Sequence, residues 1–562
     1  MNRLTFRFCP FLLLVAPVLS RGLQAQPVVN IVVNAASYRF PALPQSDIAQ
    51  GSMFVIFGQQ LGPATLQLAT APFGLQLAGT SIRVSGGGVT ADAVPIYTSA
   101  TQVAAILPSR IPPGDATITV TYLDRSSMNR IRVARSSFGI FTRNQAGSGP
   151  AIVQNYNSAT DQPVNALTAP ARPGQVMILW GTGLGPVGYD DAQLPRVGDL
   201  DVEAEVMVGN KSARILYKGR SPQFPGIDQI NFEVPADAPE GCHVPLAVRA
   251  GGVVSNFASI AIASAEAVCS DAIGYSAADL DKLRSAGQLR LGELTLIKTT
   301  VPDLKGFLDQ AHLVFARQVP ATAVKALSVG KESHLPYGTC TVTSGFVPAG
   351  DTNLPGDPTV VQRLRGGASI NLQGPRGAKQ IERRGSENDR DFYNAGIGGL
   401  IPGFSGDAGP EYLVPGLYTV DLPAGSDVGA FSATLTLPAP IQWTNRDSFS
   451  VIQRSQDLTV TWTGGDSAKE YVIVGANSLN TARQVAAGIT CMERASAGRF
   501  TIPAWLLATL PASGSLPGTS LPMGRVEFST YTIVEPARFQ AQGIDVGYFG
   551  YELINWKLAA FQ

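Results

Sequence analysis

The segment VMILWGTGLGPV, residues 176–187, has the composition of a loop that could bind phosphate. An apolar run leads into Gly181, Gly183 and Gly185, and glycines let backbone N–H groups come close to a phosphate. A dinucleotide-binding loop, however, has the spacing GxGxxG and opens a helix, whereas this loop has GxGxG and continues into Pro186. We therefore predict a turn in a β-structure here, with no nucleotide or other cofactor.

Other patterns that carry catalysis or metal binding are weak or missing. The three histidines, His243, His312 and His334, lie far apart in the sequence and form no HExxH motif. There is no GxSxG nucleophile elbow. Asp190 and Asp191 could ligate calcium, but the ligand pattern of a calcium loop is absent, and a solvated loop is the alternative. Two distant carboxylates could still meet in the fold as a glycosidase pair, and no local motif supports one.

The first 25 residues have the pattern of a secretory signal peptide. Arg3 and Arg7 supply the positive start, residues 11–19 an apolar core, and Ala25 a small residue at which cleavage could occur. The apolar core is shorter than the roughly 20 residues that a transmembrane helix needs. We predict an exported protein, in the periplasm, at the cell surface or outside the cell, with no transmembrane segment in the mature chain.

Removal of the signal peptide takes Cys9 away and leaves four cysteines. An even number in an exported chain favours disulfides, and the absence of a CxxC pair argues against a zinc site. Four cysteines allow three pairings. We predict Cys242–Cys269, because the strand that starts at Cys242 turns at a Gly-Gly pair and an antiparallel return brings the chain back towards it. The pair Cys340–Cys491 then follows by elimination.

The composition favours many short strands joined by turns. Of 562 residues, 45% are hydrophobic and only 15% are charged, while 59 are glycine and 40 are proline. This length is too great for one core and predicts three or four domains. The formal net charge of zero leaves no overall basic field for nucleic acid. The most charged run, residues 376–391, has mixed signs and no interleaved aromatic residues, so we expect a solvated loop, with a patch for an acidic polymer as the alternative.

A repeat explains the glycine loop. Residues 49–63, AQGSMFVIFGQQLGP, align without a gap with residues 172–186, RPGQVMILWGTGLGP. The first copy carries two glutamines inside the loop, where a phosphate site needs a free backbone. A second match joins TQVAAILPSRIPPG to DQINFEVPADAPEG. Each copy spans about 120 residues, which is the size of a domain and too long for a solenoid unit. The shared features are a buried strand, a glycine that allows a sharp turn and a leucine that packs back.

The repeated region resembles the paired immunoglobulin-like, IPT/TIG-type domains of exported Acidobacteria proteins, especially relatives of Solibacter. The resemblance rests on NAASY, the two glycine segments, PGIDQINFEVPADAPEGC and GGVVSNFASIAIA, and it covers nearly half of the chain. The first copy departs from the pattern at TQVAAILP. Residues 270–562 also resemble the C-terminal part of such proteins, notably at LTVTWTGGD. The resemblance implies a β-sandwich fold and a surface location, and no established activity.

Local patterns predict the remaining elements. ATITVTYL, FSATLTLP and DLTVTWTGG alternate apolar and polar residues, as half-buried antiparallel strands do. Residues 276–287 form the one clear helix, with Ser276 as N-cap and Gly287 as its end, and Pro503 begins a short helical turn. The expected fold is all-β, with tandem immunoglobulin-like β-sandwiches and a few short helices. The expected division is a signal peptide (1–25), two repeats (28–143 and 150–266), a β-rich unit that opens with the helix (270–438) and, after Pro438 and Pro440, a C-terminal sandwich-like unit (441–562).

Exposed aromatic side chains on the loops of a sandwich commonly bind sugars. Trp443, Tyr548, Phe549 and Tyr551 are the candidates here, and positions in the core or at an edge are the alternative. We predict an exported binding or structural protein that recognises a polysaccharide or a cell-surface protein, without a cofactor and without nucleic acid. A secreted hydrolase or hydrolase accessory protein, with its site in residues 270–438, is the alternative function.

Overall fold

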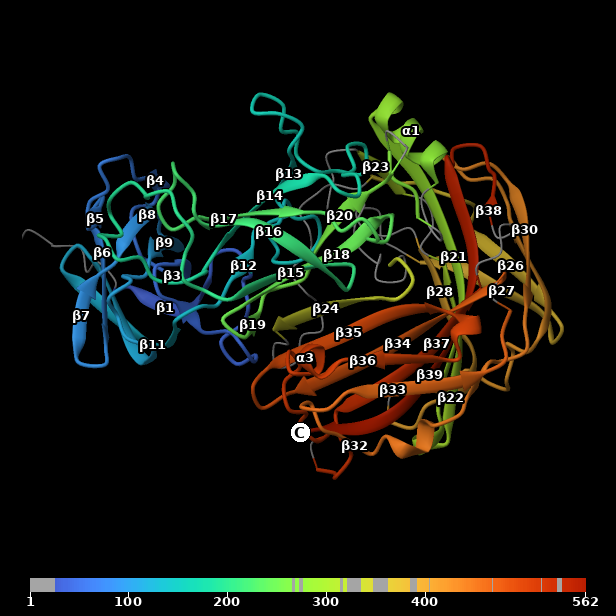
Figure 1. Ribbon diagram of the computed structural model, residues 1–562. Coiled ribbons are helices and arrows are strands. Elements are labelled where there is room, and N and C mark those ends of the chain that lie inside the picture. The colour runs from blue at the N-terminus through green and yellow to red at the C-terminus, as the bar shows by residue number, and fades with distance from the viewer. Residues whose placement is uncertain are drawn as a thin grey trace, which may run out of the picture.

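The computed structural model describes most of the chain after the predicted signal peptide, which lies outside the described residues. The protein is all-β and consists of two immunoglobulin-like sandwiches followed by a larger C-terminal body (Figure 1). The structure describes residues 26–562 except 265–267, 272–275, 314–316, 321–334, 347–361, 385–391, 404, 467, 517 and 533–537.

The first sandwich buries alternate residues of its strands between two sheets. Its strands are β1 (Val28–Asn34), β2 (Ile48–Ala49), β3 (Met53–Gln59), β4 (Gln67–Leu68), β5 (Gln76–Leu77), β6 (Thr80–Gly86), β7 (Val89–Asp92), β8 (Val94–Thr98), β9 (Gln102–Ile106), β10 (Gly114–Tyr122) and β11 (Arg125–Ala134). One sheet has the order β1-β3-β9-β8-β4, and the other has β2-β11-β10-β6-β5 with β7 on β6. Ile118 and Val120 of β10 face the core, as their alternation predicted.

The second sandwich repeats this topology. Its strands are β12 (Gly139–Ile140), β13 (Val153–Asn155), β14 (Val176–Thr182), β15 (Ala204–Val208), β16 (Lys211–Arg220), β17 (Asp228–Glu233), β18 (Gly241–Ala250), β19 (Val253–Val254) and β20 (Ala258–Ile262). β14 pairs with β17 as β3 pairs with β9, and β15 pairs with β18 as β6 pairs with β10. β12 pairs with β14, although the sequence assigned residues up to 143 to the first repeat.

The glycine shared by the two copies has a different role from the one predicted. Gly58 lies within β3 and Gly181 within β14, so each is a strand residue and not the residue that makes the turn. A β-carbon on Gly58 would overlap the carbonyl of Val28, and one on Gly181 would overlap the ring of Phe138. Glycine is needed because a neighbouring strand comes close. The leucine that follows is fully buried in both copies, as expected: Leu61 and Leu184.

The C-terminal body is built on one large sheet. Its elements are α1 (Ala277–Ala286), β21 (Gln288–Val301), β22 (Gly306–Leu313), β23 (Arg317–Pro320), β24 (Thr339–Phe346), β25 (Gln362–Arg363), β26 (Ser369–Gly374), β27 (Gly377–Arg384), β28 (Phe392–Leu400), β29 (Gly416–Leu422), β30 (Phe431–Leu437), β31 (Gln442–Trp443), β32 (Val451–Ile452), β33 (Leu458–Thr463), β34 (Glu470–Asn480), β35 (Val485–Arg494), β36 (Arg499–Ile502), α3 (Ala504–Leu507), β37 (Gly524–Thr532), β38 (Arg538–Phe539) and β39 (Val546–Phe561). The order in the described part is β24-β35-β34-β37-β39-β21-β22-β28-β27-β26-β29-β30.

This sheet crosses the boundary that the sequence suggested between 438 and 441. β21 and β39 run parallel and pair from Leu291 with Val546 to Thr300 with Asn555, so strands from the two expected units lie side by side (Figure 1). The prolines that suggested a linker follow β30, which is the last strand in the order of the large sheet. After them the chain enters a small separate sheet formed by β31, β33 and β36. Residues 270–438 and 441–562 therefore share one sheet.

Local predictions for this body agree with the structure. α1 has Ser276 as its N-cap, with a capping box to Asp279, and ends at Gly287 in the left-handed conformation at φ 70°. β30 and β33 bury every second residue, as their alternation predicted. The helical turn predicted from Pro503 is α3, with Pro503 as its N-cap. Among the described residues, no helix has the length and hydropathy to cross a membrane.

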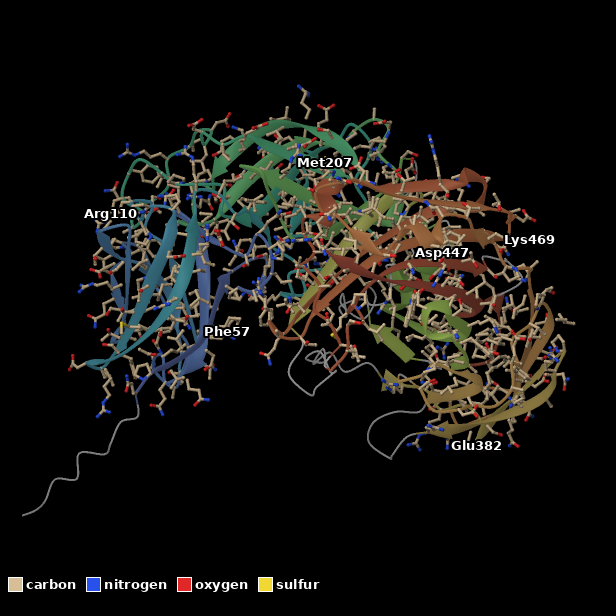
Figure 2. All side chains as sticks on the ribbon, turned by 90° about the horizontal axis from the view of Figure 1, so that it is seen from below. Phe57, Arg110, Met207, Glu382, Asp447 and Lys469 are labelled. Atoms are coloured by element: carbon tan, nitrogen blue, oxygen red, sulfur yellow. A yellow bond between two sulfur atoms is a disulfide. The ribbon has the colours of Figure 1, made fainter. Side chains whose placement is uncertain are left out.

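The three bodies form an arc and are tied together at both junctions. Figure 2 shows the first sandwich with Phe57, the second with Met207, and the C-terminal body with Glu382 and Lys469. Phe257 of the second sandwich stacks on Trp505 of α3, with ring centroids 6.4 Å apart. The structure contains both predicted disulfide bonds: Cys242–Cys269 joins the second sandwich to the segment before α1, and Cys340–Cys491 joins β24 to β35.

Candidate functional site

The aromatic residues proposed as ligand contacts are mostly packing residues. Trp443 is partly buried and packs 5.9 Å from Phe449 and 5.6 Å from Phe528, measured between ring centroids. Phe549 is fully buried and Tyr551 is 6% exposed, so the core alternative holds for these two. Tyr548 is partly buried and packs against the hydrophobic cluster that contains Cys242 and Cys269. The physical reason is the central position of β39, which packs Phe549 and Tyr551 into a core on one of its faces.

The other face of β39 carries polar side chains that the sequence analysis did not select. Side chains alternate along a strand, and directly paired residues of neighbouring strands share a face. Trp556 is paired with Glu527 of β37, and Glu552 is paired with Tyr531. This face lies opposite the one that buries Phe528 in the core. We call it the Trp556 face and define it by Arg525, Glu527, Ser529, Glu552 and Trp556.

Polar contacts fix the indole of Trp556. Its Nε1–H donates a hydrogen bond to Glu527 Oε2 at 3.1 Å, and the guanidinium carbon of Arg525 lies 4.2 Å from the ring centroid. The hydroxyl of Ser529 donates to Glu527 Oε1 at 3.2 Å. Arg525 Nε is buried and, within the described residues, has no hydrogen-bond acceptor. This atom lies 3.7 Å from Glu527 Oε2, so the ion pair of Arg525 with Glu527 and the hydrogen bond from Trp556 together hold the indole in a fixed orientation.

An apolar groove of about 110 Å³ continues from Trp556 and Arg525. One wall is the loop after α3, which is held to the sheet because Gly514 N–H donates to Leu479 O at 2.9 Å, and which is closed by Leu516 N–H donating to Leu521 O at 2.8 Å. The groove is thus mainly apolar and is lined by Trp556 and Arg525, with Glu527 hydrogen-bonded to the indole. Its apolar lining includes Val301, Leu479, Leu516, Leu521, Met523 and Leu558.

Glu552 lies on the Trp556 face without a charged partner. No hydrogen bond or ion pair within the described part of the chain reaches its carboxylate. Burial, and then the negative charge of Glu527, raise the pKa of Glu552 to about 8. Gly550, two residues earlier, has no side chain, and the phenol of Tyr531 lies over it. The face therefore combines Glu527, which has hydrogen-bond partners, with the carboxyl group of Glu552, which holds its proton near neutral pH.

The pKa of Glu552 predicts a pH dependence of stability. Between about pH 5 and 8 the folded chain holds a proton that the unfolded chain has released, so stability falls as pH rises, by up to about 1.4 kcal/mol per pH unit. Glu552→Gln is expected to remove this fall, which urea unfolding at pH 5 and pH 9 measures. Glu382→Gln, at an exposed position of β27, is the control and should keep it. An unchanged pH dependence in Glu552→Gln would contradict the assignment.

The glycine loop of the second sandwich binds a carboxylate of its own chain. The N–H groups of Gly183 and Leu184 donate to Asp228 Oδ2 at 2.6 and 2.7 Å. Arg220 forms a buried ion pair with Asp228 and donates to the carbonyls of Gly51 at 2.8 Å and of Gly185 at 2.7 Å. The backbone N–H groups that would approach a phosphate in a nucleotide loop thus bind a carboxylate of the same sandwich, and Arg220, paired with that carboxylate, contacts the first sandwich at Gly51.

The other candidates from the sequence have structural contacts or lie partly outside the described residues. Asp191 accepts hydrogen bonds from the N–H and the hydroxyl of Ser109, both at 2.7 Å, and so joins the two sandwiches. Among the described residues, no group of three or more His, Cys, Asp or Glu side chains could hold a metal ion. His243 is buried in β18. His334 and residues 385–391 of the charged run lie outside the described residues.

A fully buried carboxylate in the described part of residues 270–438, the range suggested for a hydrolase site, also has structural partners. Asp309 of β22 is fully buried, pairs with Lys298 at 2.9 Å, and accepts the N–H groups of Tyr412 and Leu413 at 2.7 and 2.8 Å. Lys298 in turn contacts Glu411 at 2.9 Å. A carboxylate with all these partners stabilises the fold and offers no free base.

Comparisons with known proteins give no assignment. No protein-family model and no curated protein matches the chain. Among solved structures, the surface layer protein SbsC, domains 4–9, is 10% identical, with a TM-score of 0.16. The match covers 93% of this chain and 83% of the SbsC chain. SGBP-B from Bacteroides uniformis is 10% identical, with a TM-score of 0.16 and coverages of 95% and 98%. The chain spans only 18% of the plexin A4 ectodomain, which is 12% identical with a TM-score of 0.16. Similarities this low carry no argument about function.

Proposed function

We propose that the protein acts outside the cytoplasm as a binding protein whose C-terminal body holds a polysaccharide on the Trp556 face. The observation that carries the proposal is the oriented indole of Trp556, which has Arg525 and Glu527 beside it and an apolar groove along it. A sugar ring has an apolar C–H face and a rim of hydroxyl groups, so it needs an aromatic surface together with donors and acceptors at its edge.

The chemistry of the face suits hydroxyl groups. Glu527 supplies acceptors, the protonated carboxyl of Glu552 supplies a donor and an acceptor, and the guanidinium of Arg525, whose side chain is 39% exposed, supplies donors. Ser529 is fully buried and holds Glu527 in place through its hydroxyl. These side chains come from two adjacent strands of a large sheet, which hold them in fixed register. A chain of sugars that crosses the strands would meet several of them in succession. The two disulfide bonds support an oxidising compartment, in agreement with the predicted export.

The test is a binding array of cell-wall and capsular polysaccharides, probed with the oxidised mature chain. We expect saturable binding to at least one polymer, and at least a tenfold loss of affinity in Trp556→Ala and in Glu527→Gln. The second variant keeps the size of the side chain and removes only its charge, so it separates binding from folding. Thermal unfolding of each variant checks that the body is intact.

Trp180→Ala is the matched control. Trp180 is also a partly buried tryptophan whose indole N–H has a side-chain acceptor, Gln154 at 2.9 Å, but it lies in the second sandwich. It should leave polysaccharide binding unchanged. Equal losses in Trp180→Ala and Trp556→Ala, or normal binding in a folded Glu527→Gln protein, would show that the Trp556 face is not the site.

A further inference from the structure

A cavity of about 230 Å³ lies between the second sandwich and α1. Leu283 of α1 packs in one cluster with Cys242 of β18 and Ala261 of β20, so residues of both bodies form the cavity. Cys242, Ile260, Ala261 and Leu283 form its buried apolar lining. The cavity is independent of the Trp556 face, with which it shares no residue.

The floor of this cavity is rigid. The side chain of Asn165 donates to Ala261 O at 2.9 Å and accepts from Ala261 N–H at 2.8 Å. Cys242, which is bonded to Cys269, is part of the lining, and Cys269 N–H donates to Leu167 O at 3.0 Å. A preformed apolar space of this size keeps its shape without a ligand, which lowers the entropic cost of binding.

The charges at the rim have one sign. Arg143 and Arg284 line the cavity, and no aspartate or glutamate does so among the described residues. Arg284 forms an ion pair at 2.7 Å with Asp281, which does not line the cavity. Arg284 also lies in the last turn of α1, near the negative end of the helix dipole. The guanidinium of Arg143 has no ion pair in the described part of the chain. The hydroxyls of Thr168 and Ser259 lie on the same lining and can donate hydrogen bonds.

We infer that this cavity binds a small organic acid with an apolar body. The apolar floor takes the body, and the carboxylate lies at the rim, where Arg143 supplies a charge-assisted pair of hydrogen bonds and a hydroxyl supplies a third. A neutral molecule of the same shape fills the floor but leaves Arg143 unpaired. An amine of that shape meets two cations of its own sign.

The experiment is calorimetric titration of the oxidised, full mature chain with benzoate, benzyl alcohol and benzylamine. We expect saturable binding of benzoate, binding of benzyl alcohol at least tenfold weaker, and none of benzylamine. Arg143→Met should weaken benzoate at least tenfold and leave benzyl alcohol unchanged. Arg143 is exposed, so this variant keeps its fold, and Thr168→Val provides a second, smaller loss.

Arg110→Met is the matched control, because Arg110 is an exposed arginine of the first sandwich (Figure 2). It should bind benzoate like the unaltered protein. Equal affinity for benzoate and benzyl alcohol, equal losses in the two arginine variants, or no saturable binding of any probe would each overturn the inference. None of these outcomes bears on polysaccharide binding by the Trp556 face.

Discussion

Arg220→Met is expected to destabilise the junction of the two sandwiches by about 3–5 kcal/mol, as loss of one partner of a buried ion pair does. The side chains of Arg220 and Asp228 are 3% and 0% exposed. Without the guanidinium, Asp228 keeps two backbone N–H donors but loses its counter-charge, and the carbonyls of Gly51 and Gly185 lose their donor. Hydrogen exchange of the β14 and β17 amides, together with urea unfolding, measures the loss.

The double variant Arg220→Met, Asp228→Asn tests whether the unpaired buried charge of Asp228 causes this loss of stability. Neutralising both partners removes the uncompensated charge, so it should recover part of the stability that Arg220→Met loses. Arg83→Met breaks an exposed ion pair with Asp92 and should leave the unfolding free energy unchanged within error. Comparable losses for Arg83→Met and Arg220→Met would contradict the importance of burial at this junction.

Loss of the Cys340–Cys491 bond is expected to destabilise the C-terminal body by about 5 kcal/mol in the chain-entropy model, because the cysteines are 151 positions apart. The same model gives about 3.5 kcal/mol for Cys242–Cys269, which are 27 positions apart. In addition, β24 stands at the end of the described sheet order and pairs only with β35, so the bond anchors a strand that has a single neighbour.

The measurement compares two double variants, Cys340→Ala with Cys491→Ala and Cys242→Ala with Cys269→Ala, by thermal and urea unfolding under oxidising conditions. The first should unfold at the lower temperature and denaturant concentration. The unaltered chain, reduced without denaturant so that both bonds are lost, should have a midpoint temperature and a midpoint urea concentration no higher than those of either double variant. If the shorter loop proves the more important one, native contacts and not the entropy of the unfolded chain decide the effect.

Much of the fold was predictable from sequence because its signals are local. β10, β30 and β33 alternate residue by residue, α1 has a serine cap and a glycine end, and an ungapped repeat gives the two sandwiches. The parallel pairing of β21 with β39 had no such signal, because pairing between distant segments leaves no local pattern. Two prolines after β30 therefore suggested a boundary that the sheet crosses.

The candidate site was less accessible to sequence analysis for a related reason. Alternation in GRVEFSTYT shows that Arg525 and Glu527 share one face of a strand, but it does not say which neighbour provides an indole on that face. Trp556 is supplied by β39, whose register against β37 is a property of the folded sheet. Likewise, successive residues of the aromatic run near residue 548 alternate between the two faces of β39, and the sequence does not show that the face with Phe549 and Tyr551 is the one that packs into the core.

The parallel pairing of β21 with β39 sets an order of events during synthesis. β21 ends at Val301 and its partner begins at Val546, so the central ladder of the C-terminal body closes only when more than two hundred intervening residues have emerged. Contacts this distant in sequence make folding slow. The two sandwiches, each built from one continuous stretch of the chain, can fold one after the other as they emerge. In a chain exported as proposed here, the parallel ladder at the centre of the C-terminal body thus forms only after β39 has crossed the membrane.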